Sequence, residues 1–206
     1  MSKFGISKDT KSNNVVPFQP SELKPITQGY LVEVSSEDRT LKDETKKDVL
    51  AFKFVDIEKK RVHTHVEWEL EEDDKFESKL EAMQSRIKHI FEAFAPFPDN
   101  GIGNKAKNMK EFFNEVAEAF NTTGNAGSPV YVNKPVHIKV AYSLKYAKAG
   151  LQLPYSPNFI EPVVSGKATT LAINKKYETL TQPTSTSATD MPGAAPFNEF
   201  GGATPF

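Results

Sequence analysis

The feature that most constrains the fold of this chain is its hydrophobic periodicity, which changes twice along the sequence. Alternation between apolar and polar side chains is typical of β-strands, whereas apolar residues at positions i, i+3 and i+4 are typical of amphipathic helices. Alternation or a β-rich apolar run predicts five strands, over Gln28–Val34, Asp48–Ile57, Arg61–Leu70, Val136–Tyr142 and Ala168–Ile173. Helical spacing between the third and fourth strands predicts two helices, over Asp73–Ala95 and Lys107–Asn121, the second with a capping box of Asn108 and Glu111.

This order of elements predicts a mainly β fold with an α insertion, of the α+β class. Five strands interrupted after the third are typical of an OB-type barrel, here with a larger insertion. We therefore expect a five-stranded OB-like barrel with a two-helix insertion between strands 3 and 4. Residues 1–27 would form an N-terminal arm, residues 28–180 the barrel domain with its insertion at 73–122, and residues 181–206 a flexible tail. The tail is rich in Thr, Ser, Pro, Gly and Ala, a composition that favours disorder.

Composition and missing motifs exclude several classes of protein. The chain has no cysteine, which removes disulfides, thiolate nucleophiles and cysteine-based zinc sites. It contains no GxxxxGK[ST], GxSxG or HExxH motif, so we expect neither an enzyme nor a cofactor. No apolar run approaches the ~18 residues that a membrane span needs, and the N-terminus lacks the apolar core of a signal peptide. We expect a soluble, cytoplasmic protein that does not bind membranes.

His63 and His65 lie on the same face of one predicted strand, as metal ligands sometimes do. The simpler interpretation is that His63, His65, Glu67 and Glu69 form an exposed polar face, opposite the apolar face of Val62, Val66 and Trp68. We expect the exposed polar face and no metal site.

Lysines and aromatic residues are interleaved in the C-terminal third of the folded part. Residues 101–177 contain ten lysines and four glutamates, which gives this stretch a net charge of +6 in a chain whose net charge is −1. Cations that follow the phosphates, together with aromatic rings on which unpaired bases stack, are what single-stranded nucleic acid requires. For phosphates the candidates are Lys139, Lys145, Lys148, Lys175 and Lys176; for stacking they are Tyr146, Tyr155 and Tyr177, followed by Tyr142 and Phe159. Lys53, Arg61 and His63 on adjacent strands would extend this surface.

The tail carries Phe200 and ends in Pro205-Phe206. A terminal apolar side chain beside a carboxylate suits a partner with an apolar pocket and a basic rim. Phe200, Pro205 and Phe206 are therefore candidates for partner binding.

The layout resembles that of phage-type single-stranded-DNA-binding proteins. The segments His137–Val140, Leu153–Tyr155 and Pro157–Glu161 are similar to the late strand and loop of their OB folds, and Arg86–Ile90 is similar to their inserted helix. Pro205-Phe206 is similar to the tip of bacterial single-stranded-DNA-binding proteins, although the tail has only Asp190 and Glu199 as acids. The resemblance implies a protein that coats and protects single-stranded DNA, without sequence preference, during phage DNA replication, recombination and repair in the host cytoplasm. It further implies recruitment of replication and recombination proteins through the tip, and we expect self-association through the N-terminal arm.

Two alternatives stay open at this point. In the first, the chain is a virion, assembly or protein-interaction component that does not bind nucleic acid, as its near-zero net charge would suit. In the second, it is a small enzyme or metalloprotein centred on His63 and His65.

Overall fold

The computed structural model describes residues 4–8, 26–41, 43–57, 62–144, 151–153 and 159–180. Its elements are β1 (Ile26–Thr40), β2 (Lys46–Asp56), β3 (Val62–Trp68), α1 (Phe76–Glu92), α2 (Met109–Thr122), the short 3₁₀ helix η1 (Asn125–Gly127), β4 (Pro135–Lys139), β5 (Ala141–Ser143), β6 (Leu151–Gln152), β7 (Ile160–Pro162) and β8 (Glu178–Thr179). The expected mainly β fold, with two helices inserted between the third and fourth strands, is confirmed.

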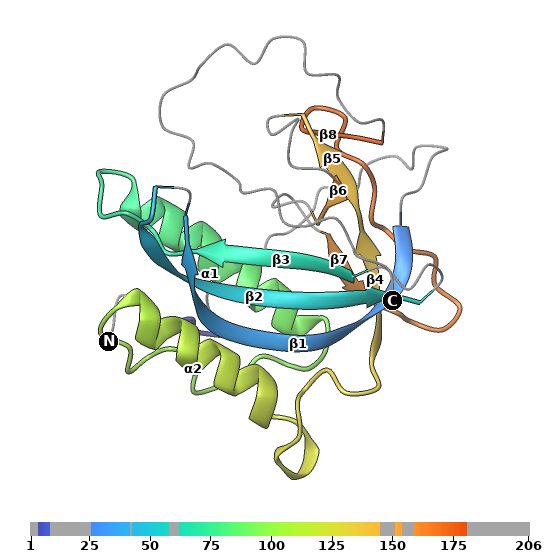
Figure 1. Cartoon of the computed structure of the whole chain (residues 1–206). Helices are drawn as coiled ribbons and strands as arrows, with labels where there is room; N and C mark the ends of the chain where they lie inside the picture. The colour runs from blue at the N-terminus through green and yellow to red at the C-terminus, as the bar shows by residue number, and fades with distance from the viewer. Residues whose placement is uncertain are drawn as a thin grey trace, which may run out of the picture.

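The strands form two antiparallel sheets. The larger has the order β3-β2-β1-β4-β7, and the smaller, which we call the small sheet, has the order β6-β5-β8. The long strand β1 is shared between two neighbours: it pairs with β2 over most of its length and with β4 through its first residues. Within the described residues the larger sheet is open, with β3 and β7 at its edges, so a closed barrel is not seen there. Figure 1 shows the small sheet rising from the end of the larger sheet where β4 lies.

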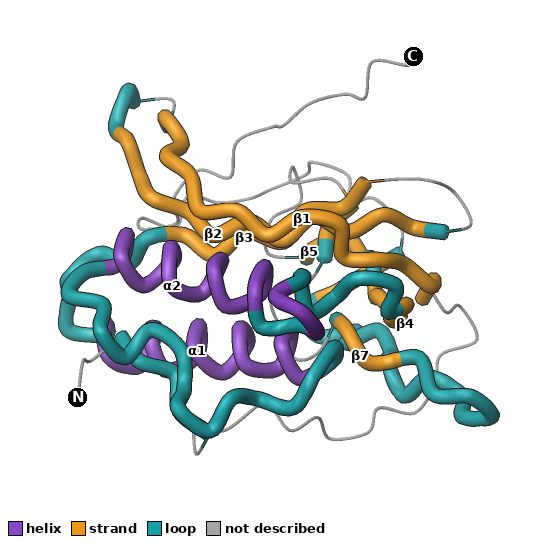
Figure 2. The backbone as a smooth tube through the Cα atoms, turned by 90° about the horizontal axis from the view of Figure 1, so that it is seen from below, coloured by secondary structure: helices purple, strands orange, loops and turns teal. Residues whose placement is uncertain are grey.

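Both helices pack as one layer on a single face of the larger sheet (Figure 2). Their apolar faces meet β2 in an aromatic cluster, in which the Phe120 ring centroid lies 5.2 Å from that of Phe52 and 5.0 Å from that of Phe91. All three rings are fully buried, and such pairs contribute about 0.5–1.5 kcal/mol beyond their burial. This cluster joins β2, α1 and α2.

The start of α2 follows the sequence expectation closely. The Asn108 side-chain oxygen accepts a hydrogen bond from the Glu111 backbone N–H at 2.9 Å, which satisfies one of the free donors of the first turn. The Glu111 carboxylate in turn accepts a hydrogen bond of 2.9 Å, but from the backbone N–H of Lys107 rather than from that of the cap residue. The predicted cap is confirmed, with the return bond shifted by one residue.

The prediction that His63, His65 and Glu67 lie on an exposed face of β3 is wrong. His63, His65 and Glu67 point toward the helices and are only 8%, 1% and 1% exposed. The reason is a partner on α1, since the Arg86 guanidinium donates two hydrogen bonds of 2.7 Å to the two carboxylate oxygens of Glu67. His65 Nε2 lies 2.8 Å from the same carboxylate. A charged residue can face a core when a paired cation compensates the loss of hydration, and Val62 is consequently on the outer face.

The strand expected over Ala168–Ile173 does not form. Side chains take up the backbone donors that a strand would need, since Glu161 accepts from the Thr170 N–H at 2.9 Å and the Thr169 hydroxyl accepts from the Leu171 N–H at 3.2 Å. Local side-chain bonds of this kind compete with sheet pairing. The last strand lies further along the chain, at β8.

Because Glu67 is buried and paired, we expect the stability of the fold to decrease at acid pH. Burial alone would raise the pKa of Glu67, but the Arg86 guanidinium and the His65 hydrogen bond outweigh it and lower the pKa from 4.5 to about 2. A depressed carboxyl pKa stabilises the fold fully above about 4.5, and the contribution is lost as the pH falls toward 2. We expect a loss on the order of 3 kcal/mol across this window, measured as thermal unfolding against pH, and a flatter profile for Glu67→Gln. Equal slopes for the two proteins would contradict this assignment.

Candidate nucleic-acid interface

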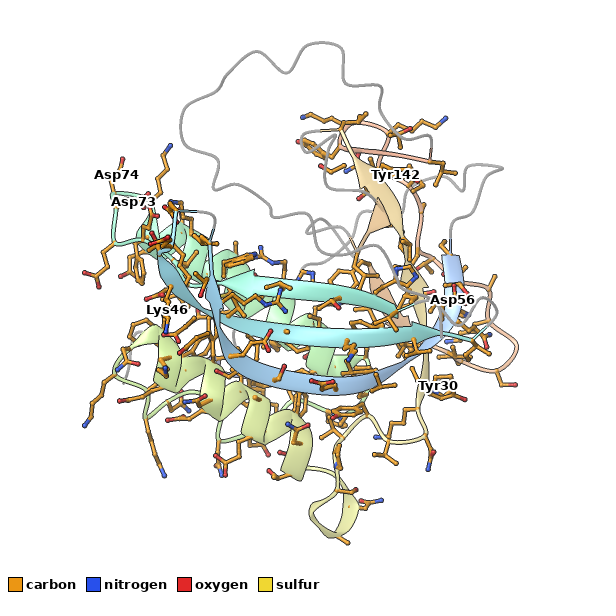
Figure 3. The ribbon with its side chains drawn as sticks, in the orientation of Figure 1. Tyr30, Lys46, Asp56, Asp73, Asp74 and Tyr142 are labelled. Carbon is orange, nitrogen blue, oxygen red and sulfur yellow. The ribbon has the colours of Figure 1, made fainter. Side chains whose placement is uncertain are left out.

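The small sheet brings four of the sequence candidates together. Tyr142 lies on β5, and Lys175, Lys176 and Tyr177 form a turn just before β8, which we call the Lys–Tyr turn. β5 pairs with β8 through Tyr142 and Thr179, and the Leu144 N–H donates to the Tyr177 carbonyl at 2.9 Å. Figure 3 shows Tyr142 on the small sheet, far from the acidic residues Asp73 and Asp74 at the other end of the molecule.

The Lys–Tyr turn presents its three side chains to solvent. Lys175 and Lys176 are exposed, and Tyr177 is 48% exposed although it is a large aromatic residue. The Lys176 ammonium lies 5.0 Å from the centre of the Tyr177 ring. A side-chain hydrogen bond to Tyr177 raises the pKa of Lys176 above its ordinary value. Two cations and one half-exposed aromatic ring therefore occupy three consecutive positions.

Asn174 gives the turn its shape. Its side-chain oxygen accepts from the Lys176 N–H at 3.2 Å, and its carbonyl accepts from the N–H groups of Tyr177 and Glu178, both at 2.8 Å. Asn favours such local hydrogen bonds, which is why it commonly begins turns. The turn is thus fixed by the residue that precedes its exposed side chains.

The turn is anchored in the core by an ion pair. The Lys139 ammonium lies 3.0 Å from the Glu178 carboxylate and 3.0 Å from the Ala172 carbonyl oxygen, and the side chains of Lys139 and Glu178 are 1% and 3% exposed. The second carboxylate oxygen of Glu178 accepts from the Asn174 N–H at 2.9 Å. Burial lowers the pKa of Lys139 and raises that of Glu178, while the attraction between the two opposes both shifts.

Lys139 therefore occupies a different place from the one the sequence predicts. We expected its ammonium to face phosphates, but it is buried and paired across β4 and β8. Since the pair cancels its own charge, the charge that this region presents comes from its exposed lysines. The other carboxylate among described residues 130–180, that of Glu161, is bonded to the Thr170 N–H and hydroxyl.

Three further candidates lie apart from the Lys–Tyr turn. Phe159 is 3% exposed and belongs to the core, where its ring stacks on that of His65 at a centroid distance of 4.6 Å. His63 is buried on the helix side of β3. Lys53 is exposed on β2, but its ammonium lies 3.2 Å from the Glu33 carboxylate. The expected single surface that includes these residues is not formed.

The remaining candidates lie outside the described residues. They are Arg61, Lys145, Tyr146, Lys148 and Tyr155, together with Phe200, Pro205 and Phe206 of the tail. In the sequence, Lys145, Tyr146 and Lys148 follow β5 almost directly.

A second exposed feature was missed by the sequence reasoning. Tyr30, Val55 and Val62 are cross-strand neighbours on β1, β2 and β3, and Tyr30 and Val62 are 38% and 54% exposed. A register shift between Leu31 and Glu33 in β1 turns Leu31 and Val34 inward and leaves Tyr30 and Val32 outside. A bulge of this kind breaks strict alternation, so the pattern of apolar residues in β1 could not reveal this row.

No protein-family model, curated protein or solved structure matches this chain. In the part of the chain that the structure describes, no group of three or more histidine and acidic side chains is placed to hold a metal ion. None of the described helices combines the length and the apolar character that crossing a membrane would require.

Proposed function

We propose that this protein binds single-stranded DNA without sequence preference and coats it during phage DNA replication, recombination and repair. The observation that carries the proposal is the Lys–Tyr turn, where Lys175, Lys176 and Tyr177 are exposed side by side next to Tyr142 on β5. The only carboxylate in the turn region, Glu178, is buried against Lys139 and does not repel phosphate.

The chemistry of this turn favours a single strand over a duplex. Lys175 and Lys176 neutralise phosphates and release counterions, a contribution that falls with salt. Tyr177 offers a ring on which an unpaired base stacks, worth about 1–3 kcal/mol per base and tolerant of sequence. In a duplex the bases already stack on one another, so this contribution is lost. Lys145, Tyr146 and Lys148, which follow β5 in the sequence, are further candidates for contacts with the same DNA strand.

An OB-type barrel is our finer interpretation of the fold. Its support is the shared strand β1, which pairs with both β2 and β4, and the contact between β3 and β6, which links the free edge of the larger sheet to the small sheet. OB folds bind oligonucleotides on the face of strands 2 and 3 and on neighbouring loops. We further propose that the protein acts in the host cytoplasm, with Phe200, Pro205 and Phe206 as the contact for replication and recombination proteins.

The experiment that tests this function is a fluorescence-anisotropy titration of labelled oligo-dT and of a matched duplex, at low and moderate salt. We expect salt-sensitive binding to the single strand only. Removing Lys175 and Lys176 together should reduce the slope of log affinity against log salt by about 1.4. Tyr177→Ala should weaken binding roughly 5- to 150-fold with the salt slope unchanged.

The matched control is Lys105→Ala with Lys107→Ala, which removes the same charge from two exposed lysines ahead of α2. If this control lowers the slope as much as the loss of Lys175 and Lys176, binding depends on overall charge and not on the turn. No binding to oligo-dT at low salt would overturn the proposed function. The apolar row of Tyr30, Val55 and Val62, of which Tyr30 and Val62 are exposed, would then favour the alternative, a protein-interaction or assembly component, because exposed apolar patches mark protein contacts.

A further inference from the structure

The described N-terminal residues, Phe4–Lys8, do not project as an arm but dock on the helix layer. Phe4 and Ile6 are 4% and 0% exposed and belong to the main core. The Phe4 ring lies 6.4 Å from that of Phe76 and 6.3 Å from that of Phe112, on the two helices. We call Phe4–Lys8 the N-terminal segment.

The docking has the character of strand pairing. Ile6 and Ile102 exchange two backbone hydrogen bonds, of 2.6 and 2.8 Å, as an antiparallel pair. Glycines allow this close approach: a side chain at Gly5 would overlap the side chain of Asn104, and a Cβ at Gly103, whose φ is +78°, would lie 2.5 Å from the Phe112 ring. The surface around Ile102 thus fits one extended segment with a glycine between two apolar residues.

Polar contacts complete the docking. The Gln84 amide donates to the Gly5 carbonyl at 3.1 Å, and the Lys88 ammonium donates to the Lys8 carbonyl. The Lys8 ammonium in turn pairs with Asp99. Every partner named here lies between residues 76 and 112, in the helical insertion. The N-terminal segment therefore binds one compact block of the fold, and the same contacts form whichever copy of the chain supplies the segment.

The connector between the N-terminal segment and β1 is long enough for the segment of one copy to reach a neighbouring copy. Seventeen residues, 9–25, separate Lys8 from Ile26, and they reach at most about 60 Å when extended. A domain of this size has a radius of gyration of about 16 Å. Flexible linkers in general give the segment that they tether a local concentration in the millimolar range. Copies bound side by side on one DNA strand are present at a similar local concentration.

We propose that copies lined up on single-stranded DNA exchange their N-terminal segments, so that Phe4 and Ile6 of one copy dock beside Ile102 of the next. This inference rests on the proposed function, because DNA supplies the local concentration. Exchange of identical elements keeps every contact and is a low-cost route to association. The exchanged segments link neighbouring copies and make coating of a long strand cooperative.

A disulfide test is direct, because the chain has no cysteine of its own. Ile6 and Ile102 form a hydrogen-bonded antiparallel pair, whose Cα atoms are about 5.5 Å apart, within the range that a disulfide spans. One full-length chain carries Ile6→Cys and a second, tagged to a different length, carries Ile102→Cys. The two are mixed and oxidised on a long oligo-dT and on one that holds a single copy. A cross-chain disulfide forms only when the segment docks in trans.

We expect the cross-chain product to rise roughly tenfold on the long strand relative to the short one. Replacing Ile102→Cys by Val132→Cys, at an exposed position outside the docking surface, should abolish it. If the mixture gives no cross-chain product on the long strand while a chain with both cysteines closes its own disulfide, the segment docks only in cis and exchange is overturned.

Failure of exchange is distinguishable from failure of DNA binding. Anisotropy of the same samples reports DNA binding directly. The mixture is also oxidised without DNA at about 1 mM protein. Cross-chain product under this condition would support exchange, and its absence would overturn exchange. Gly5→Val is a second variant that blocks docking without cysteine. We expect it to keep its affinity for the short strand and to lose cooperativity on the long one; unchanged cooperativity would contradict the proposal.

Discussion

Arg86→Met is expected to lower the free energy of unfolding by about 3–5 kcal/mol, one of the two largest losses we expect from a single substitution. Glu67 is 1% exposed and receives two hydrogen bonds of 2.7 Å from the Arg86 guanidinium. Methionine fills much of the same volume but leaves the carboxylate in the core without its cation. The cost is therefore that of an uncompensated buried charge rather than that of a cavity.

Arg39→Met is the matched control for this prediction. Arg39 pairs with Glu37 in a surface ion pair whose side chains are 23% and 44% exposed, and such pairs contribute about 0–1 kcal/mol. Thermal unfolding measures both variants, and for a chain of this length 3–5 kcal/mol corresponds to roughly 6–20 °C. Combining Arg86→Met with Glu67→Met should recover much of the loss, because neither charge of this pair is then left buried. Equal effects at Arg86 and Arg39 would show that the buried pair has no special weight.

Lys139→Met is expected to cost a similar amount and also to release the Lys–Tyr turn. It leaves Glu178 buried without its partner, while Glu178 holds the turn through the Asn174 N–H. Burial already raises the pKa of Glu178, and loss of the cation should raise it further. A carboxyl whose folded pKa is raised loses stability as the pH rises above its unfolded value near 4.5. The variant should therefore be closest to the wild type near that pH and weakest at neutral pH.

Two measurements separate a local from a global effect of Lys139→Met. Hydrogen exchange of the Tyr177 and Glu178 amides, which donate to the Asn174 carbonyl, should become faster, whereas exchange in α2 should not change beyond the loss of overall stability. Affinity for oligo-dT should fall although the buried ammonium cannot reach phosphate. Adding Glu178→Gln should restore part of the stability. Unchanged exchange in the turn would show that the ion pair does not hold it.

The positions of most elements could be predicted from the sequence, because periodicity is a local signal. The second and third strands, both helices and the Asn108 cap are found close to where the pattern places them. The first strand starts near its predicted position but runs on to Thr40, and the predicted strand Val136–Tyr142 is divided between β4 and β5, which belong to different sheets. Which face of a strand is buried depends instead on a partner elsewhere. The pattern of β3 offers one face with valines and one with His63, His65 and Glu67, and hydrophobicity alone selects the valine face. Arg86, on the neighbouring helix, lets the face of His63, His65 and Glu67 pack toward the core, although Val66 on the opposite face is buried as well.

The candidate interface also has a part that could be predicted from the sequence and a part that depends on the tertiary fold. The part that depends on neighbours in sequence, Lys175, Lys176 and Tyr177, is exposed as expected. The lysine in β4 could not be assigned from the sequence, since its partner Glu178 lies 39 positions away and only the tertiary fold brings the two together. Phe159 was equally ambiguous, because an aromatic residue in a core has the same local signature as one that stacks on a base.

The shared strand β1 also determines when the larger sheet can be completed. A ribosome makes β1, β2 and β3 first, yet the N-terminal part of β1 pairs with β4, which follows both helices in the chain. Until β4 has been synthesised, the strand that will lie at the centre of the sheet presents an unpaired edge, and such edges readily pair with the wrong chain. Pairing between segments this distant in sequence is also intrinsically slow. We therefore expect wrong pairing of β1 to be favoured during the interval of translation between β3 and β4.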